Sequence, residues 1–143
     1  MKDHLNQLID IFENQIPANN MIGMKVLSIS VGKVEVFVPF KAEFIGDYRQ
    51  GFWHGGILAS IADAAGGLAG FTTLNSPADK INTIDMRIDY LAPAIKADVF
   101  VEVTLIKVGK RILNADVIIY QADKNNPVAV ARCAYSLLKN LKS

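Results

Sequence analysis

The sequence contains few of the residues on which common enzyme motifs and scaffolds depend. Its 143 residues include one cysteine and two histidines. The single cysteine, Cys133, excludes a disulfide within the chain and fits a reducing, cytoplasmic setting. No cluster of histidine and cysteine has the spacing of metal ligands, so no metal site is predicted. The sequence also has no Gly-x-Ser-x-Gly elbow, no Walker loop and no dinucleotide-binding glycine pattern.

The sequence also lacks an excess of positive or negative charge and a long apolar run. The chain has 15 Lys and Arg against 14 Asp and Glu, a net charge of +1. We therefore expect no nucleic-acid partner. The longest apolar run is shorter than about 18 residues and contains Asp63, so neither a membrane span nor a membrane partner is predicted. The N-terminus is unlike a secretory signal. A hydrophobic content of 51% indicates a substantial core, and we expect one domain over residues 1–143.

The most informative stretch is residues 51–67, a glycine-bearing loop that leads into a helix apolar or small on every side. Such a helix has to be buried all round. Asp63 lies in its middle, and a buried charge costs several kcal/mol unless it is paired or functional. His54 lies in the loop, and the backbone amides of Gly55 and Gly56 would favour a negative oxygen at the helix start. Together these features predict an acyl-transfer site.

The rest of the chain predicts strands on both sides of this helix. Residues 1–16 carry one apolar stripe and predict a flanking helix that ends at Pro17. The central helix should extend to about Leu74. Strands grouped around one helix favour an α+β fold with an antiparallel sheet of about six strands curved around that helix, the hot-dog arrangement. Alternation and turn residues place the strands at 24–30, 33–40, 83–90, 98–108, 112–121 and 128–138.

Four motifs carry a resemblance to a known family. They are His54-Gly55-Gly56, Asp63 nine residues after the histidine, Thr83-Ile84-Asp85-Met86 and Tyr90-Leu91-Ala92-Pro93-Ala94. With these motifs the chain resembles the hot-dog-fold acyl-coenzyme A thioesterases, in particular the phenylacetate-degradation and 4-hydroxybenzoyl-coenzyme A type, over about residues 32–138. The resemblance implies an acyl-coenzyme A (acyl-CoA) substrate, no cofactor besides the coenzyme A (CoA) of that substrate, and a homodimer, with a dimer of dimers (a homotetramer) as the larger assembly.

The resemblance also implies roles for individual residues. Gly55 would polarise the thioester carbonyl through its backbone amide. Asp63 would act as a general base on water, or as a nucleophile that forms a mixed anhydride. Thr83 stands where related enzymes place a hydroxyl that orients the water. Tyr48 stands six residues before His54, where relatives often have Asn or Gln. The hydroxyl of Tyr48 could donate a hydrogen bond in place of the Asn or Gln side chain, or this role is lost in the present sequence.

Each of these residues also has a structural explanation. Asp63 could be a buried acid that hydrogen bonds satisfy. The ring of His54 is expected to hold the loop through a hydrogen bond to backbone. Thr83 is a common strand residue, and strict alternation places it with Asp85 on the polar face while Ile84 faces the core. A catalytic Thr83 would therefore need a bulge in this strand.

Several cations could hold the coenzyme. Lys107, Lys110 and Arg111 crowd a tight connection between two predicted strands. Such a cluster is usually a solvated turn, but it could also bind CoA phosphates. Arg49 and Arg87 are the alternative cations.

The acyl group is less well defined. An apolar or aryl tail is suggested by four residues that core packing explains equally well: Phe52, Trp53, Phe71 and Met86. A non-catalytic protein that binds or senses acyl-CoA is the alternative function.

Helix geometry bears on the assembly. Gly55 and Asp63 are eight residues apart, which places them about 12 Å apart along a helix axis. One thioester carbon must approach both the oxyanion donor and the attacking water. We therefore expect a homodimer with antiparallel central helices, in which each active site takes Gly55 from one subunit and Asp63 from the other.

Overall fold

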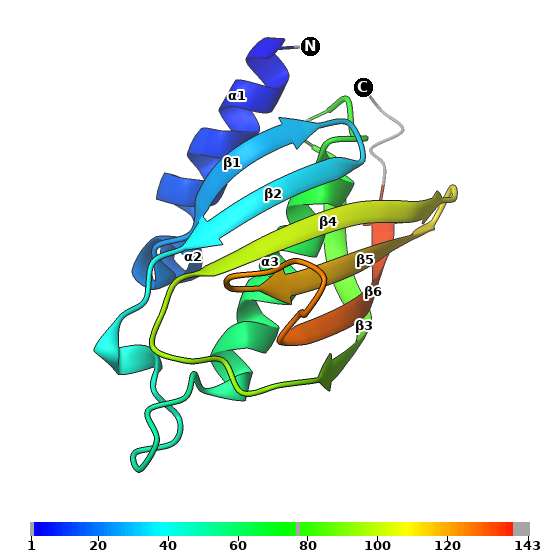
Figure 1. Cartoon of the computed structure of the whole chain (residues 1–143). Helices are drawn as coiled ribbons and strands as arrows, with labels where there is room; N and C mark the ends of the chain where they lie inside the picture. The colour runs from blue at the N-terminus through cyan, green and yellow to red at the C-terminus, as the bar shows by residue number, and fades with distance from the viewer. Residues whose placement is uncertain (1, 77, 139–143) are drawn as a thin grey trace.

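Six antiparallel strands form one curved sheet in the computed structural model, which describes residues 2–76 and 78–138 (Figure 1). The strand order is β1-β2-β4-β5-β6-β3, so β1 and β3 are the edges of this sheet. The predicted fold class, an α+β hot-dog fold with a curved sheet around one long helix, is confirmed. The strands are β1 (Lys25–Ser30), β2 (Lys33–Val38), β3 (Lys80–Tyr90), β4 (Val99–Val108), β5 (Ile112–Tyr120) and β6 (Ala129–Leu138).

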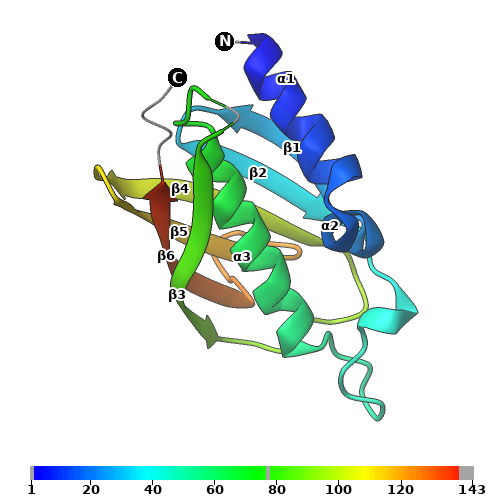
Figure 2. The same ribbon diagram turned by 180° about the vertical axis from the view of Figure 1, so that it is seen from behind.

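The long helix α3 (Gly55–Phe71) crosses the concave face of the sheet (Figure 2). Ile61, Ala65 and Ala69 recur along it at intervals of four residues and are fully buried in the core. Small side chains on this stripe let the helix lie close to the sheet, which supplies the larger side chains. The helix ends at Phe71, about one turn earlier than predicted.

Burial of α3 on all sides, which its composition predicts, is not found in the single chain. Gly56 and Ser60 are exposed, and Asp63 and Gly67 are half-buried. These residues recur every three to four positions, so they form one stripe along the helix. The sheet covers one side of α3, and this stripe is left partly open.

The N-terminal segment is more complex than the single predicted helix over residues 1–16. It comprises α1 (Lys2–Asp10), a π-helical turn (Ile11–Gln15) and a second helix, α2 (Pro17–Ile22). Pro17 was expected only to end the first helix, but it stands at the first turn of α2, where its missing N–H costs nothing. Figures 1 and 2 show α1 running beside α3 in the opposite direction.

A bulge in β3 overturns the predicted alternation there. Thr83 pairs with Tyr135 of β6, but Asp85 pairs with the next residue, Ala134, so Ile84 is an extra residue in the ladder. Ile84 is 55% exposed and does not face the core. The bulge shifts the phase of the strand by one residue, which turns Thr83 toward α3.

The remaining strand predictions agree with the structure to within two residues. The tight connection between β4 and β5 is a hairpin, and Cys133 is a buried core residue. Burial raises the pKa of the Cys133 thiol, so this side chain is neutral at physiological pH. None of the described helices has the length and apolar character needed to cross a bilayer.

Candidate active site

The start of α3 is held by His54, which caps the helix. Its ring Nδ1 accepts a hydrogen bond from the amide of Gly56 at 2.9 Å, and its own backbone amide donates to the carbonyl of Phe44 at 2.7 Å. The ring therefore uses one of the free donors at the helix start. Because Nδ1 accepts, the neutral ring carries its proton on Nε2.

The backbone amide of Gly55 is a second donor at the start of α3. Among the residues that the structure describes, nothing accepts a hydrogen bond from its backbone amide. Its carbonyl accepts one from the Tyr90 hydroxyl at 2.6 Å. The tyrosine ring lies so close that a Cβ at position 55 would stand 3.1 Å from Tyr90 Cζ. Tyr90 thus fixes the first residue of α3 and favours glycine there, while the amide stays available to an oxyanion.

Asp63 lies two turns further along α3 and is half-buried. Its Oδ1 accepts a hydrogen bond from Thr83 Oγ1 at 2.8 Å, which the bulge in β3 makes possible. Its backbone carbonyl accepts another from the Tyr135 hydroxyl at 2.7 Å. Hydrogen bonds to a charged acceptor are short and strong. The sheet therefore orients this residue through both its carboxylate and its backbone.

Tyr135 is 1% exposed and packs between β6 and α3. Burial raises the pKa of its hydroxyl far above the ordinary value, so the group stays protonated and acts as a donor. Its oxygen occupies the space beside Gly66, where an added Cβ would overlap it. The neighbouring Gly67 has room, because a Cβ there would meet only Tyr135 Cε1 at 3.8 Å.

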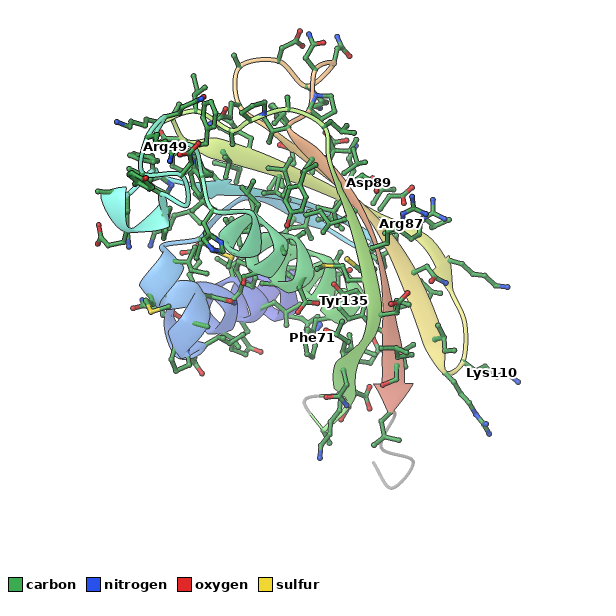
Figure 3. The ribbon with its side chains drawn as sticks, turned by 90° about the horizontal axis from the view of Figure 1, so that it is seen from below. Arg49, Phe71, Arg87, Asp89, Lys110 and Tyr135 are labelled. Carbon is green, nitrogen blue, oxygen red and sulfur yellow. The ribbon has the colours of Figure 1, made fainter. Side chains whose placement is uncertain are left out.

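A cavity of about 500 Å³ begins at Asp63 and Thr83 and extends between α3 and the N-terminal segment. Its middle is apolar. Figure 3 shows Phe71 and Tyr135, two of its lining residues, near the centre of the molecule. Along α3 it is lined by Asp63, Ala64, Gly67, Leu68 and Phe71, and along the N-terminal segment by His4, Gln7, Leu8, Ile11, Phe12, Ile16 and Asn19.

The loop before α3 holds two further candidates at the surface. Tyr48 is 85% exposed. Its hydroxyl accepts a hydrogen bond from Arg49 Nε at 3.1 Å, and the guanidinium lies over its ring. Neither side chain contacts Asp63 or lines the cavity within the described chain.

The other cationic candidates are dispersed. Arg87 is exposed and pairs with Asp89 at 3.4 Å, and Lys110 and Arg111 are exposed in the β4–β5 hairpin. Figure 3 shows Arg49 and Lys110 at opposite ends of the molecule. One chain therefore does not bring these cations together into a phosphate site.

The aromatic residues suggested for an acyl tail divide between core and cavity. Phe71 lines the cavity. Trp53 is a packing residue, because its indole N–H donates to the Ala97 carbonyl at 2.9 Å and its ring stacks on Phe44. Phe52 and Met86 are half-buried and do not line the cavity.

Sequence reasoning missed Tyr90 and Tyr135 as residues that position the site. Tyr90 could have been found, because it opens the Tyr-Leu-Ala-Pro-Ala motif and precedes the end of a strand. Tyr135 gives no such signal, since alternation in β6 marks it only as a core residue. The cavity wall formed by the N-terminal segment was also missed.

Comparison with known proteins agrees with this architecture. The family model of the thioesterase superfamily matches residues 50–128. A medium/long-chain acyl-CoA thioesterase, YigI of Escherichia coli (strain K12), is 24% identical in an alignment of 127 positions that covers 80% of this chain and 82% of the relative.

Two solved structures share the fold at low identity. Thioesterase HI1161 of Haemophilus influenzae superposes with a TM-score of 0.82 at 23% identity, covering 96% of this chain and 92% of that one. A mutant of the phenylacetic acid degradation protein PaaI of Thermus thermophilus gives a TM-score of 0.75 at 24% identity, over 85% and 99% of the two chains.

The family model covers more than half of the chain, including the whole of α3. The chain therefore belongs to the thioesterase superfamily. It is an enzyme of the thioester hydrolase class.

Proposed function

We propose that this protein hydrolyses the thioester of an acyl- or aryl-CoA to the free acid and coenzyme A, without a further cofactor. One observation carries this proposal. The carboxylate of Asp63, held by Thr83, lines a largely apolar cavity of about 500 Å³. Cavities of this size accept small organic ligands, and a carboxylate that lines one can activate water beside a bound acyl group.

Asp63 acts on water in this mechanism. Thr83 occupies Oδ1, which leaves Oδ2 to take a proton from a water molecule. The water oxygen bonds to the thioester carbon, and the negative charge that forms on the carbonyl oxygen is stabilised by the amide of a Gly55. The carbon–sulfur bond then breaks, and the proton passes from Asp63 to the departing sulfur. In the alternative mechanism a carboxylate oxygen of Asp63 bonds to the thioester carbon, the carbon–sulfur bond breaks and coenzyme A leaves as the thiolate, and water then hydrolyses the mixed anhydride to the free acid.

The two catalytic groups come from different subunits in this proposal. Gly55 and Asp63 lie eight residues apart on the same straight helix, about 12 Å along its axis. A single thioester carbon cannot be close to both. A second copy with its α3 antiparallel to the first brings Gly55 of each subunit beside Asp63 of the other.

Two features of the single chain support this homodimer. The first part of the open stripe of α3, with the exposed residues Gly56 and Ser60, has small side chains that allow a second helix to approach closely. Within the described chain the edge strand β3 pairs with a neighbour on one side only, and it carries the exposed residues Ile84 and Tyr90. Unpaired edges of this kind favour pairing with another strand. The dimer of dimers remains a prediction.

The coenzyme is expected to bind at the rim of the composite site. Arg49 and Tyr48 lie in the loop that precedes Gly55, so a dimer places them near its thioester. Arg87, Lys110 and Arg111 are the other cations proposed for the phosphates.

Complementation between damaged subunits tests the catalytic groups and the composite site together. Asp63→Ala removes the base, and Gly55→Pro removes the amide at the first position of α3, where the helix backbone accepts proline but the added ring presses on Tyr90. Each variant alone should release almost no thiol from a panel of short, medium, long and aryl thioesters of coenzyme A. When the two are unfolded together and refolded, random pairing makes about half of the dimers mixed, each with one intact site. Activity should therefore recover to about a quarter of the wild-type value.

Two controls make the result decisive. Mixing without refolding should restore nothing, and mixed dimers should be detected by a mass tag on one subunit. If mixed dimers form and stay inactive, the shared site is wrong. If the wild type binds acyl-CoA and never releases thiol, the protein is a binding protein and the proposed hydrolysis is wrong.

A further inference from the structure

The cavity beside Asp63 has a defined length. It follows α3 from Asp63 through Gly67 to Phe71, which is eight residues or about 12 Å. An extended alkyl chain with bonds of about 1.5 Å advances about 1.3 Å per carbon, so the apolar part holds about nine carbons. Because α1 runs antiparallel to α3, its first residues lie at the far end (Figure 2).

Polar side chains gather at the far end of the cavity. His4, Gln7, Ser76 and Asp79 line it there, beside the apolar residues Leu74 and Ile81. The Nε2 atom of His4 is buried and has no hydrogen-bond partner in the described chain. An apolar tail that reached this end could not satisfy His4 Nε2, which is unfavourable. The polar end therefore limits the length of an apolar ligand.

Gly67 controls passage along the cavity. It lies one turn beyond Asp63, about 6 Å along the axis, and lines the cavity. A Cβ added there would meet only Tyr135 Cε1, at an ordinary contact distance of 3.8 Å. A larger side chain at this position therefore projects into the cavity and does not strain the helix. A leucine would block it about four to five carbons from the carboxylate.

Resting on the proposed function, we infer that the cavity between α3 and the N-terminal segment binds the acyl chain of the substrate. The preferred substrates are thioesters of medium-chain fatty acids, with about eight to ten carbons. Gly67 is the residue that keeps the cavity open to chains longer than about five carbons. The polar far end limits its depth.

The test is a chain-length profile. The specificity constant kcat/KM would be measured by thiol release for butanoyl-, hexanoyl-, octanoyl-, decanoyl- and hexadecanoyl-CoA. Each buried methylene contributes about fourfold to affinity, from about 0.8 kcal/mol. Gly67→Leu should lower kcat/KM for decanoyl-CoA by about 50-fold or more and leave that for butanoyl-CoA within about threefold. Gly67→Ala, the matched control, should keep most of the activity toward decanoyl-CoA.

The outcomes separate this inference from the proposed function. Equal losses of kcat/KM for butanoyl- and decanoyl-CoA in a folded Gly67→Leu variant would indicate that the cavity binds the pantetheine part of coenzyme A. This result would overturn the inference. An unchanged profile would also overturn it. If the wild type releases no thiol from any substrate, the proposed function fails. Calorimetric binding of decanoyl-CoA then decides the cavity assignment. Tight binding that Gly67→Leu abolishes supports it, and equal binding by both proteins refutes it.

Discussion

The adjacent glycines Gly66 and Gly67 should respond in opposite ways to the same substitution. Both lie inside α3, where replacing glycine by alanine ordinarily stabilises a helix by about 1 kcal/mol. At Gly67 the added methyl group has room, so Gly67→Ala should be neutral or stabilising by up to that amount. At Gly66 the methyl group would overlap the hydroxyl oxygen of Tyr135, so Gly66→Ala should destabilise the fold.

The size of the effect follows from the surroundings of Tyr135. This ring is 1% exposed, so it has no solvent to move into. Displacing it breaks the 2.7 Å hydrogen bond to the carbonyl of Asp63, and leaving such a buried group unsatisfied costs about 1–3 kcal/mol. Overpacking costs about 1–3 kcal/mol more. After the gain in helix propensity, Gly66→Ala should lose about 1–5 kcal/mol of unfolding free energy.

Urea unfolding at one fixed protein concentration, followed by circular dichroism, measures this difference. Tyr135→Phe provides the second half of a double-mutant cycle, because it removes the overlapping oxygen. The ring carbons Cζ and Cε2 then remain 3.2 and 3.3 Å from the new methyl group, which is tight but tolerable. Gly66→Ala should cost at least about 1 kcal/mol less in a protein that already carries Tyr135→Phe. Equal stability of the Gly66→Ala and Gly67→Ala variants would refute the reasoning.

Two further predictions concern catalysis and coenzyme binding. Thr83→Val should lower kcat by about tenfold or more, because Asp63 loses a charge-assisted hydrogen bond, while Thr83→Ser should retain most of the rate. A rate for Thr83→Val within about threefold of wild type would contradict this role. If the β4–β5 hairpin binds the CoA phosphates, Arg111→Ala should raise KM with little change in kcat, and the penalty should shrink as salt is added. An unchanged KM at low salt would show that the hairpin does not bind the CoA phosphates, and Arg49 and Arg87 would be the next cations to test.

Most of the fold could be predicted from the sequence because its signals are local. Alternating apolar residues and turn residues mark the strands to within a few positions. The all-apolar helix with its single carboxylate marks the centre of the sheet. The N-terminal segment was predicted less well, because Pro17 is compatible both with the end of one helix and with the first turn of the next. Tertiary packing decides between them.

The geometry at Thr83 could not be predicted because it depends on a bulge. A pattern of period two assumes an uninterrupted ladder, and it placed Ile84 inside and Thr83 outside. The one-residue shift between Thr83 and Asp85 in the pairing with β6 exchanges these two positions. Ile84 is a β-branched residue typical of regular strands, so nothing in its identity signals the bulge. The contact between Thr83 and Asp63 is visible only in three dimensions.

The Gly66-Gly67 pair is a second case in which the sequence alone could not predict the geometry of the site. Two identical letters in a helix suggest one reason for both, such as close approach of a neighbouring element. The structure separates them. Gly66 accommodates the hydroxyl of Tyr135, which holds the backbone of Asp63, whereas Gly67 faces the cavity that begins at the same residue. One glycine therefore supports the position of the proposed base, and the other leaves space for the chain on which it would act. Substitution at 66 should change stability, and substitution at 67 should change the choice of substrate.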